Sequence, residues 1–136
     1  MIVGVGVDLV VISRIRRLME RWQNRFLQRV FTPDELAYAL RRRDPAEHLA
    51  ARFAAKEATL KALGTGLTLG VRWREMEVQR VRGARPTLAL SGRTQTLGSA
   101  RGVRVLHLSL THDGDYALAQ VVAEGETPAP DPTPRP

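Results

Sequence analysis

The chain has 136 residues, of which 43% are hydrophobic and 26% charged, with no cysteine and a net charge of +7. This composition is typical of one soluble domain, excludes disulfides and thiolate metal sites, and contains no apolar run near the roughly 18 residues of a membrane span. No signal-peptide pattern opens the chain, so we expect a cytoplasmic protein whose positive charge favours an anionic partner, whether nucleic acid, acidic protein or phosphorylated small molecule.

The first segment predicts a strand followed by a helix. Residues 1–12 alternate and are rich in valine and isoleucine, which is typical of a buried strand. Gly4 and Gly6 lie on one face of it, which indicates that another element packs very close there. Residues 13–29 place apolar side chains at helical spacing and predict one helix.

Two capping signals predict the next helices. Thr32 and Glu35, with a proline at the first helical position, form a capping box and start a short helix that runs to about residue 43. Residues 44–47 repeat the signal and begin a long helix, which Gly64 ends.

The second half of the chain predicts mostly strands. Two strand-like runs at residues 73–81 and 85–92 are joined by residues 82–84, which suit a hairpin turn. Residues 91–101 predict a short helix.

The end of the domain predicts a second hairpin. Residues 103–111 and 116–123 alternate clearly and flank a tight turn at residues 112–115. Residues 125–136 are proline-rich without apolar periodicity, so we expect a disordered tail. The elements together indicate one α+β domain over residues 1–124.

On a helical wheel, the long helix packs on two sides and carries charges between them. Glu57 and Lys61 share a narrow polar strip, and an ordinary ion pair along the helix is one explanation for them. Lys56 lies among leucines, so we expect it to reach a water-filled cleft or to bind an anion. The leucine side holds Leu49, Phe53, Leu60 and Leu63, and the alanine side holds Ala51, Ala54, Ala58 and Ala62.

Asp8 interrupts an otherwise apolar strand, where a buried carboxylate is costly unless it is paired. A helix cap or a salt bridge would satisfy it. Alternatively, Asp8 and Glu57 supply two oxygens to Mg²⁺, with waters and phosphate oxygens completing the octahedron. The three histidines show no ligand spacing, which disfavours zinc as the metal.

The glycines after the long helix allow a backbone to approach a ligand closely. They are Gly64, Gly66 and Gly70. A lone Gly-x-Gly is a weak signal, and a C-terminal glycine cap explains Gly64 without any ligand.

Four arginines, Arg14, Arg17, Arg21 and Arg25, lie within an arc of about 80° on the first predicted helix. Like charges at these spacings repel one another in the free helix. An anionic partner would offset that repulsion, and a solvated arginine-rich face is the alternative.

Three segments closely resemble the holo-acyl-carrier-protein synthases, the small phosphopantetheinyl transferases. They are "GVGVDLVVISRI" at 4–15, "RFAAKEATLKALGTG" at 52–66 and "LSLTHDGDYALAQVV" at 108–122, and the likeness extends to about Ala123. Thr59 and Leu60 stand where members of the family often have an aromatic residue and a serine, and the proline-rich tail has no counterpart in the family pattern. The resemblance implies the 4′-phosphopantetheinyl transferase fold, in which a small antiparallel sheet packs with a long central helix.

The resemblance implies transfer of 4′-phosphopantetheine from coenzyme A to a serine of apo-acyl carrier protein in fatty acid biosynthesis, with release of adenosine 3′,5′-bisphosphate. Asp8 and Glu57 match the magnesium carboxylates, and Lys61 matches the lysine beside the pyrophosphate. The positions that match the coenzyme A site are Arg52, Lys56, Lys61, Gly64, Gly66 and His112. Alternatively, His112 is simply a polar residue of the predicted turn at residues 112–115, without a role in binding.

Catalysis in such a reaction is mainly positioning and charge neutralisation. The catalytic set that the resemblance implies is Glu57, Lys61 and Asp8. Mg²⁺ would bridge the two phosphates, and Lys61 would stabilise or protonate the leaving oxygen. Glu57 or Asp8, directly or through a metal-bound water, would take the serine proton, and the sequence leaves that choice open.

Acyl carrier proteins are small and acidic, so we expect the arginine-rich helix to dock one. Larger relatives contain two related halves and build the site between them. This chain has one half-length unit, so the resemblance implies a homotrimer with three interfacial sites. Asp8, Glu57 and Lys61 would come from one chain, with His112 or neighbouring backbone facing them from the next.

Two other functions are compatible with parts of this pattern. A nucleic-acid-binding domain suits the charge, but 5% aromatic content leaves few stacking platforms, and carboxylates repel phosphate unless a metal intervenes. A non-catalytic coenzyme A or nucleotide binder on the same fold is the second alternative. We expect coenzyme A and acyl carrier protein as partners, with no nucleic acid and no membrane.

Overall fold

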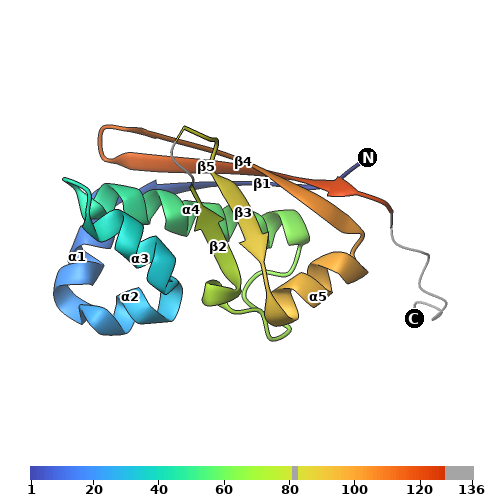
Figure 1. Cartoon of the computed structure of the whole chain (residues 1–136), viewed down its shortest axis with the longest axis horizontal. Coiled ribbons are helices and arrows are strands. Elements are labelled where there is room, and N and C mark those ends of the chain that lie inside the picture. The colour runs from blue at the N-terminus through green and yellow to red at the C-terminus, as the bar shows by residue number, and fades with distance from the viewer. Residues whose placement is uncertain (81–82, 128–136) are drawn as a thin grey trace.

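A computed structural model describes residues 1–80 and 83–127 (Figure 1). The predicted hairpin turn at residues 82–84 falls partly outside this range, as does most of the predicted tail, residues 128–136. The elements are, in chain order, β1 (Ile2–Val11), α1 (Ile12–Trp22), α2 (Asn24–Val30), α3 (Pro33–Leu40), α4 (Pro45–Leu63), the 3₁₀ helix η1 (Trp73–Glu75), β2 (Met76–Gln79), β3 (Thr87–Leu90), α5 (Gly92–Ala100), β4 (Val103–Asp113) and β5 (Tyr116–Gly125).

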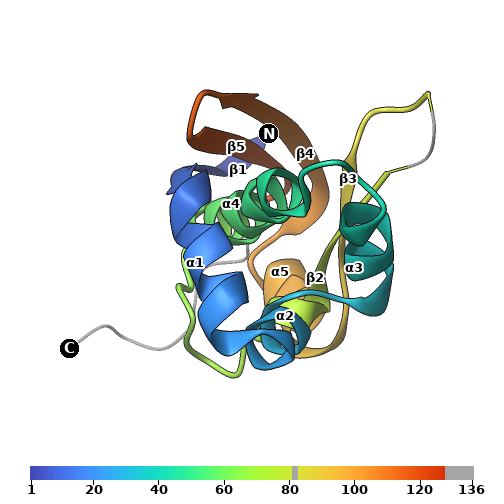
Figure 2. The ribbon, with the colours of Figure 1, turned by 90° about the vertical axis from the view of Figure 1, so that its left-hand side faces the viewer.

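The helix α4 lies between two small antiparallel sheets. One sheet has the strand order β1-β5-β4 and the other pairs β2 with β3. Figures 1 and 2 show α4 running along the three-stranded sheet, with α1, α2 and α3 gathered at one end of the molecule. The α+β class is therefore confirmed. In the described part of the chain, no helix has both the length and the apolarity that crossing a bilayer would need.

β1 and α4 touch backbone to backbone through the two predicted glycines. A Cβ added to Gly4 would overlap the carbonyl oxygen of Ala62, and one added to Gly6 would overlap that of Ala58. Any side chain at these positions would push the strand away from the helix. The close packing that Gly4 and Gly6 indicate is confirmed, and the residues of α4 at this contact are alanines.

The remaining core fills the space around α4. Its inner sheet face is built from small residues of β5, among them Ala117, Ala119 and Ala123. On the other side of the core, larger apolar side chains come from α1, such as Ile15, and from the end of α2, such as Phe31, which directly follows that helix. Small residues toward the sheet bring α4 close to it, and this closeness positions the charged residues of β1 and α4.

The prediction of a single helix over residues 13–29 is wrong. The chain forms α1 and α2, with Gln23 between them at φ 46° and ψ −129°, outside the helical region. The N–H group of Gln23 still closes the last turn of α1 on the carbonyl of Met19, at 2.9 Å. Both helices turn their apolar side chains toward the same core, so the apolar stripe continues across the break and hides it.

The other predicted boundaries are close to the observed ones. Thr32 and Glu35 form the capping box of α3, and Gly64 ends α4 in the left-handed conformation at φ 73°. The run at residues 73–81 is a strand only over β2, because its first three residues form η1. The terminal turn is shorter than predicted, since β4 reaches Asp113 and β5 begins at Tyr116.

Candidate active site

Asp8 and Lys61 meet where β1 crosses α4. The Lys61 ammonium lies 3.1 Å from the Asp8 carboxylate and also donates to the carbonyl oxygen of Val7 at 3.0 Å. The Asp8 side chain is 17% exposed, whereas that of Lys61 is 54% exposed. The salt bridge that could satisfy Asp8 is therefore present, and it sits at an edge that solvent reaches.

Glu57 stands one helical turn before Lys61 and is partly buried. Burial, and then the negative charge of Asp8, raises the pKa of the Glu57 carboxyl, while the charges of Lys61 and Arg14 lower it in part. These mutual influences place the three predicted catalytic groups in one neighbourhood, which we call the carboxylate cluster (Asp8, Glu57 and Lys61). That Asp8 and Glu57 converge on one metal ion stays a prediction.

The carboxylate cluster suits a sparsely held magnesium ion. The residues that the structure describes contain no group of three or more His, Cys, Asp or Glu side chains able to hold a metal. Two carboxylates whose repulsion helps to raise the pKa of Glu57 would be relieved by a divalent cation. Mg²⁺ is commonly bound by one or two carboxylates, with waters and substrate phosphates as its other ligands. The donor set fits such an ion.

Two of the three glycines singled out after α4, Gly64 and Gly66, differ in role. Gly64 is the helix cap, and its N–H group reaches the carbonyl of Lys61 at 3.1 Å. The Arg101 side chain also caps this end by donating to the carbonyl of Leu63 at 2.6 Å. A Cβ built on Gly66, at φ 55°, would meet no atom of the described chain within 4 Å, so the backbone is open on that side.

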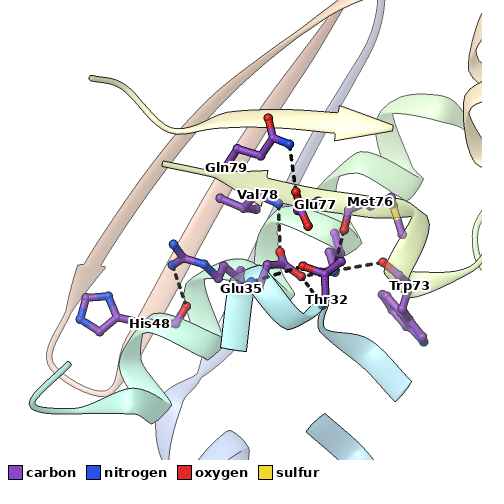
Figure 3. A network of polar contacts seen from close by, with 10 residues as sticks. Thr32, Glu35, His48, Trp73, Met76, Glu77, Val78 and Gln79 are labelled. Carbon is purple, nitrogen blue, oxygen red and sulfur yellow. Dashed lines mark hydrogen bonds and ion pairs between the residues drawn. The ribbon is translucent and has the colours of Figure 1, made fainter. Parts of the chain in front are cut away.

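Of the two alternatives predicted for Lys56, the water-filled cleft is wrong, and the anion that it meets is a carboxylate of the same chain. The Lys56 side chain is fully buried, and its ammonium lies 2.6 Å from Glu35, a residue of α3 that is labelled in Figure 3. It also donates to the carbonyl oxygens of Met76, at 2.6 Å, and Trp73, at 3.1 Å. The charge is satisfied within the protein, which leaves no exposed atom of this side chain for coenzyme A.

Glu35 completes the same network from the other side. Its carboxylate accepts N–H bonds from Thr32 at 3.0 Å and Val78 at 2.9 Å, in addition to the Lys56 contact. Burial lowers the pKa of Lys56, and the Glu35 charge acts against that change. The pair joins α3, α4 and β2 below the surface.

Arg52 is almost fully buried, at 3% exposure, and lies beside a hollow lined with arginines. Its guanidinium stacks over the Tyr38 ring at 4.2 Å, and Arg42 covers the same ring at 4.2 Å. One Arg52 nitrogen donates to the carbonyl of His48 at 3.4 Å, but the buried Nε has no partner among the described residues.

We call this hollow the arginine pocket, and its volume is about 610 Å³. It is lined by Asp34, Ala37, Tyr38, Arg41, Arg42, Arg52, Glu77, Val78, Gln79 and Arg80. Sequence reasoning did not single out Tyr38, Arg41 or Arg42 as site residues. Only the stacking of α3 against α4 brings them to Arg52, and no local pattern announces that contact.

His112 lies near the opposite end of α4 from the carboxylate cluster. Its Nε2 is 3.2 Å from the Glu47 carboxylate, in the first turn of α4. Ten residues of helix separate Glu47 from Glu57, which is about 15 Å along the axis. Within one chain, the structure therefore does not bring His112 together with Asp8, Glu57 and Lys61.

The four predicted docking arginines are all exposed, but they do not share one helix. Arg14, Arg17 and Arg21 lie on α1 and border a hollow of about 490 Å³ beside Leu18 and Trp22. Arg25 belongs to α2, beyond the break at Gln23, so the predicted single arc over all four is wrong. The positive face of α1 itself remains.

The family model of the 4′-phosphopantetheinyl transferase superfamily matches residues 4–121 of the chain. This protein belongs to that family. A holo-[acyl-carrier-protein] synthase of Syntrophotalea carbinolica is 52% identical over 122 residues, which cover 90% of this chain and 95% of the relative. The corresponding protein of Solibacter usitatus is 46% identical over 124 residues, covering 91% and 99%.

Solved structures of phosphopantetheinyl transferases share the fold. The holo-[acyl-carrier-protein] synthase of Neisseria meningitidis superposes with a TM-score of 0.84 at 35% identity, covering 91% of this chain and 99% of that one. The Helicobacter pylori protein, solved in complex with coenzyme A, has a TM-score of 0.78 at 28% identity, covering 88% and 99%. The family resemblance stated from the sequence is confirmed.

The buried pair predicts how stability responds to two equal substitutions on α4. Lys56→Met leaves the Glu35 carboxylate buried without its cation, so we expect a loss of about 3–5 kcal/mol in the free energy of unfolding. Lys61→Met removes an exposed ion pair and should cost about 1 kcal/mol or less. Urea denaturation at pH 7 measures both, and equal losses would contradict the assigned role of Lys56.

Proposed function

We propose that this protein transfers 4′-phosphopantetheine from coenzyme A to a serine hydroxyl of apo-acyl carrier protein. The observation that carries the proposal is the convergence of Asp8, Glu57 and Lys61 at the crossing of β1 and α4. Family membership and relatives named holo-[acyl-carrier-protein] synthase support it. The reaction would be magnesium-dependent and would release adenosine 3′,5′-bisphosphate.

The carboxylate cluster provides the groups that this transfer needs. Asp8 and Glu57 would hold Mg²⁺, which supplies charge neutralisation at the diphosphate. Lys61 would lie beside the bridging oxygen that leaves with the adenylate part, and its ammonium would stabilise the charge that develops there. The serine oxygen forms the new bond to phosphorus, and Glu57 or Asp8 would accept its proton.

The arginine pocket suits the anionic part of coenzyme A. The Nε of Arg52, which has no partner in the described part of the chain, and the neighbouring Arg41, Arg42 and Arg80 give a hollow that favours phosphate groups. His112 would add a contact beyond the pocket, and the open backbone of Gly66 would approach the diphosphate with Gly64. Because Lys56 is buried, we leave it out of these contacts.

We propose that the site is completed by a neighbouring copy in a homotrimer. The outer face of the three-stranded sheet exposes Val5, Val7 and Leu9, each more than half exposed, and the register sets Leu118 beside Leu9. Such an apolar strip is typical of a surface that another protein covers. A second copy would also explain why His112 and the carboxylate cluster lie at opposite ends of α4.

We propose that the acidic carrier protein docks on α1. Arg14, Arg17 and Arg21 are exposed there, and Leu18 and Trp22 provide apolar surface between the charges. Opposite charge on the carrier would offset the repulsion among the arginines and steer the encounter.

The central experiment follows the mass of an apo-acyl carrier protein incubated with coenzyme A and Mg²⁺. We expect a gain of one phosphopantetheine arm with the wild-type chain and at least about a hundredfold loss of rate with Glu57→Gln, because one charged metal ligand is removed. The thermal midpoint of the variant shows that it folds. Bound coenzyme A without any transfer by the wild type would favour the non-catalytic alternative.

A shared site predicts complementation between two damaged chains. His112→Ala and Glu57→Gln should each be impaired alone, but a co-refolded 1:1 mixture should regain activity, up to about one quarter of the sites in randomly assembled closed trimers. A site is intact when its Glu57 comes from a His112→Ala chain and its His112 comes from a neighbouring Glu57→Gln chain. If the mixture shows only the sum of the two separate activities, each site lies within one chain.

The docking face predicts a change in carrier KM. Arg17→Glu with Arg21→Glu should raise the carrier KM about tenfold or more and leave the coenzyme A KM nearly unchanged, because these charges act on encounter. We avoid Arg14, whose charge reaches Glu57. Arg104→Glu on β4 is the matched control, and an equal effect there would exclude α1 as the specific dock.

A further inference from the structure

The helix α1 begins without a cap of its own. Its N-cap residue, Val11, makes no side-chain bond to the helix, and its first turn carries no acidic residue. Arg14, Arg16 and Arg17 place positive charge where the exposed N–H groups already make the helix end positive. Local sequence therefore disfavours the start of the very helix that carries the exposed arginines.

A residue from the far end of the chain supplies the missing cap. Asp115, in the turn between β4 and β5, accepts the Ser13 N–H on Oδ1 at 2.9 Å and the Ser13 hydroxyl on Oδ2 at 2.6 Å. Its backbone carbonyl accepts the N–H of Ile12 at 2.7 Å. Two amides of the helix start and one hydroxyl are thus held by a single residue 102 positions away.

The sheet register explains how Asp115 reaches this place. Val11, the last residue of β1, pairs with Tyr116 of β5, so the β4–β5 turn lies directly beside the start of α1. Gly114, at φ 56°, allows the tight turn that presents Asp115. The same hairpin carries His112, which contacts Glu47 at the start of α4.

We propose that Asp115 is a positioning residue for carrier docking, because it holds the first turn of α1 and thereby the placement of Arg14 and Arg17. This inference rests on the docking surface of the proposed function. The carboxylate also supplies negative charge at the helix end, which offsets the dipole and the neighbouring arginines. The hairpin turn therefore sets the geometry of the docking helix from outside it.

The experiment compares Asp115→Ala with Asp115→Asn, because asparagine caps a helix about as well as aspartate. We expect the alanine variant to raise the carrier KM about fivefold, as for the loss of a typical cap, with the coenzyme A KM and kcat nearly unchanged. The asparagine variant should recover most of the wild-type carrier KM. Amide hydrogen exchange at Ser13 should accelerate in the alanine variant alone.

Asp44→Ala is the matched control, because Asp44, just before α4, contacts Arg16 of the same helix α1. It removes the exposed Arg16–Asp44 ion pair, 3.0 Å long, and should change the carrier KM by less than about twofold. A wild-type carrier KM in Asp115→Ala, or a joint change of kcat and both KM values, would overturn the inference. Failure of the proposed function would instead appear as absent transfer by the wild type, and the exchange measurement would still test the cap.

Discussion

The close contact between β1 and α4 is the constraint on which the rest of the structure depends. Gly4, Gly6 and Asp8 are two residues apart and therefore lie on the same face of β1. The face on which the glycines let the strand contact the helix backbone thus also carries the Asp8 carboxylate. Along α4, Ala58 and Ala62 form the contact, and Glu57 and Lys61 form the neighbouring row at the same spacing. Once the glycines seat the strand on the alanines, Asp8 must lie beside Lys61 and Glu57.

Because α4 is packed on several sides, its charged side chains differ in how they are buried and paired. Lys56 points into the protein and is neutralised by Glu35, which ties α4 to α3 and β2. Arg52 is buried beside a hollow, and its Nε has no hydrogen-bond partner among the residues that the structure describes. Lys61 sits at the rim, paired but accessible. Under the proposed function, the same residue types would serve stability, anion recognition and chemistry, according to how far each reaches toward solvent.

The length of α4 separates two halves of the functional surface. The carboxylate cluster lies toward its carboxyl end, whereas His112 contacts its first turn. Between them, the sheet presents an apolar outer face that the described chain leaves uncovered. These three features are consistent with the proposed assembly, in which neighbouring copies would bring complementary halves together. In that assembly a short chain would be sufficient for a reaction with two large substrates.

Local pattern by itself determined much of this protein. Alternation showed β1, the capping box of Thr32 and Glu35 started α3, Gly64 ended α4, and Asp8 and Glu57 stood out because charge is costly in apolar segments. These signals depend on residues a few positions apart. The tertiary structure alone decided the break at Gln23, the pairing of Lys56 with Glu35, the pocket around Arg52 and the Asp115 cap on α1. Three of these features join residues that are distant in the sequence and meet only through packing. The break at Gln23 is a backbone bend that leaves the apolar period unchanged. Neither kind of feature produces a periodic pattern in the sequence.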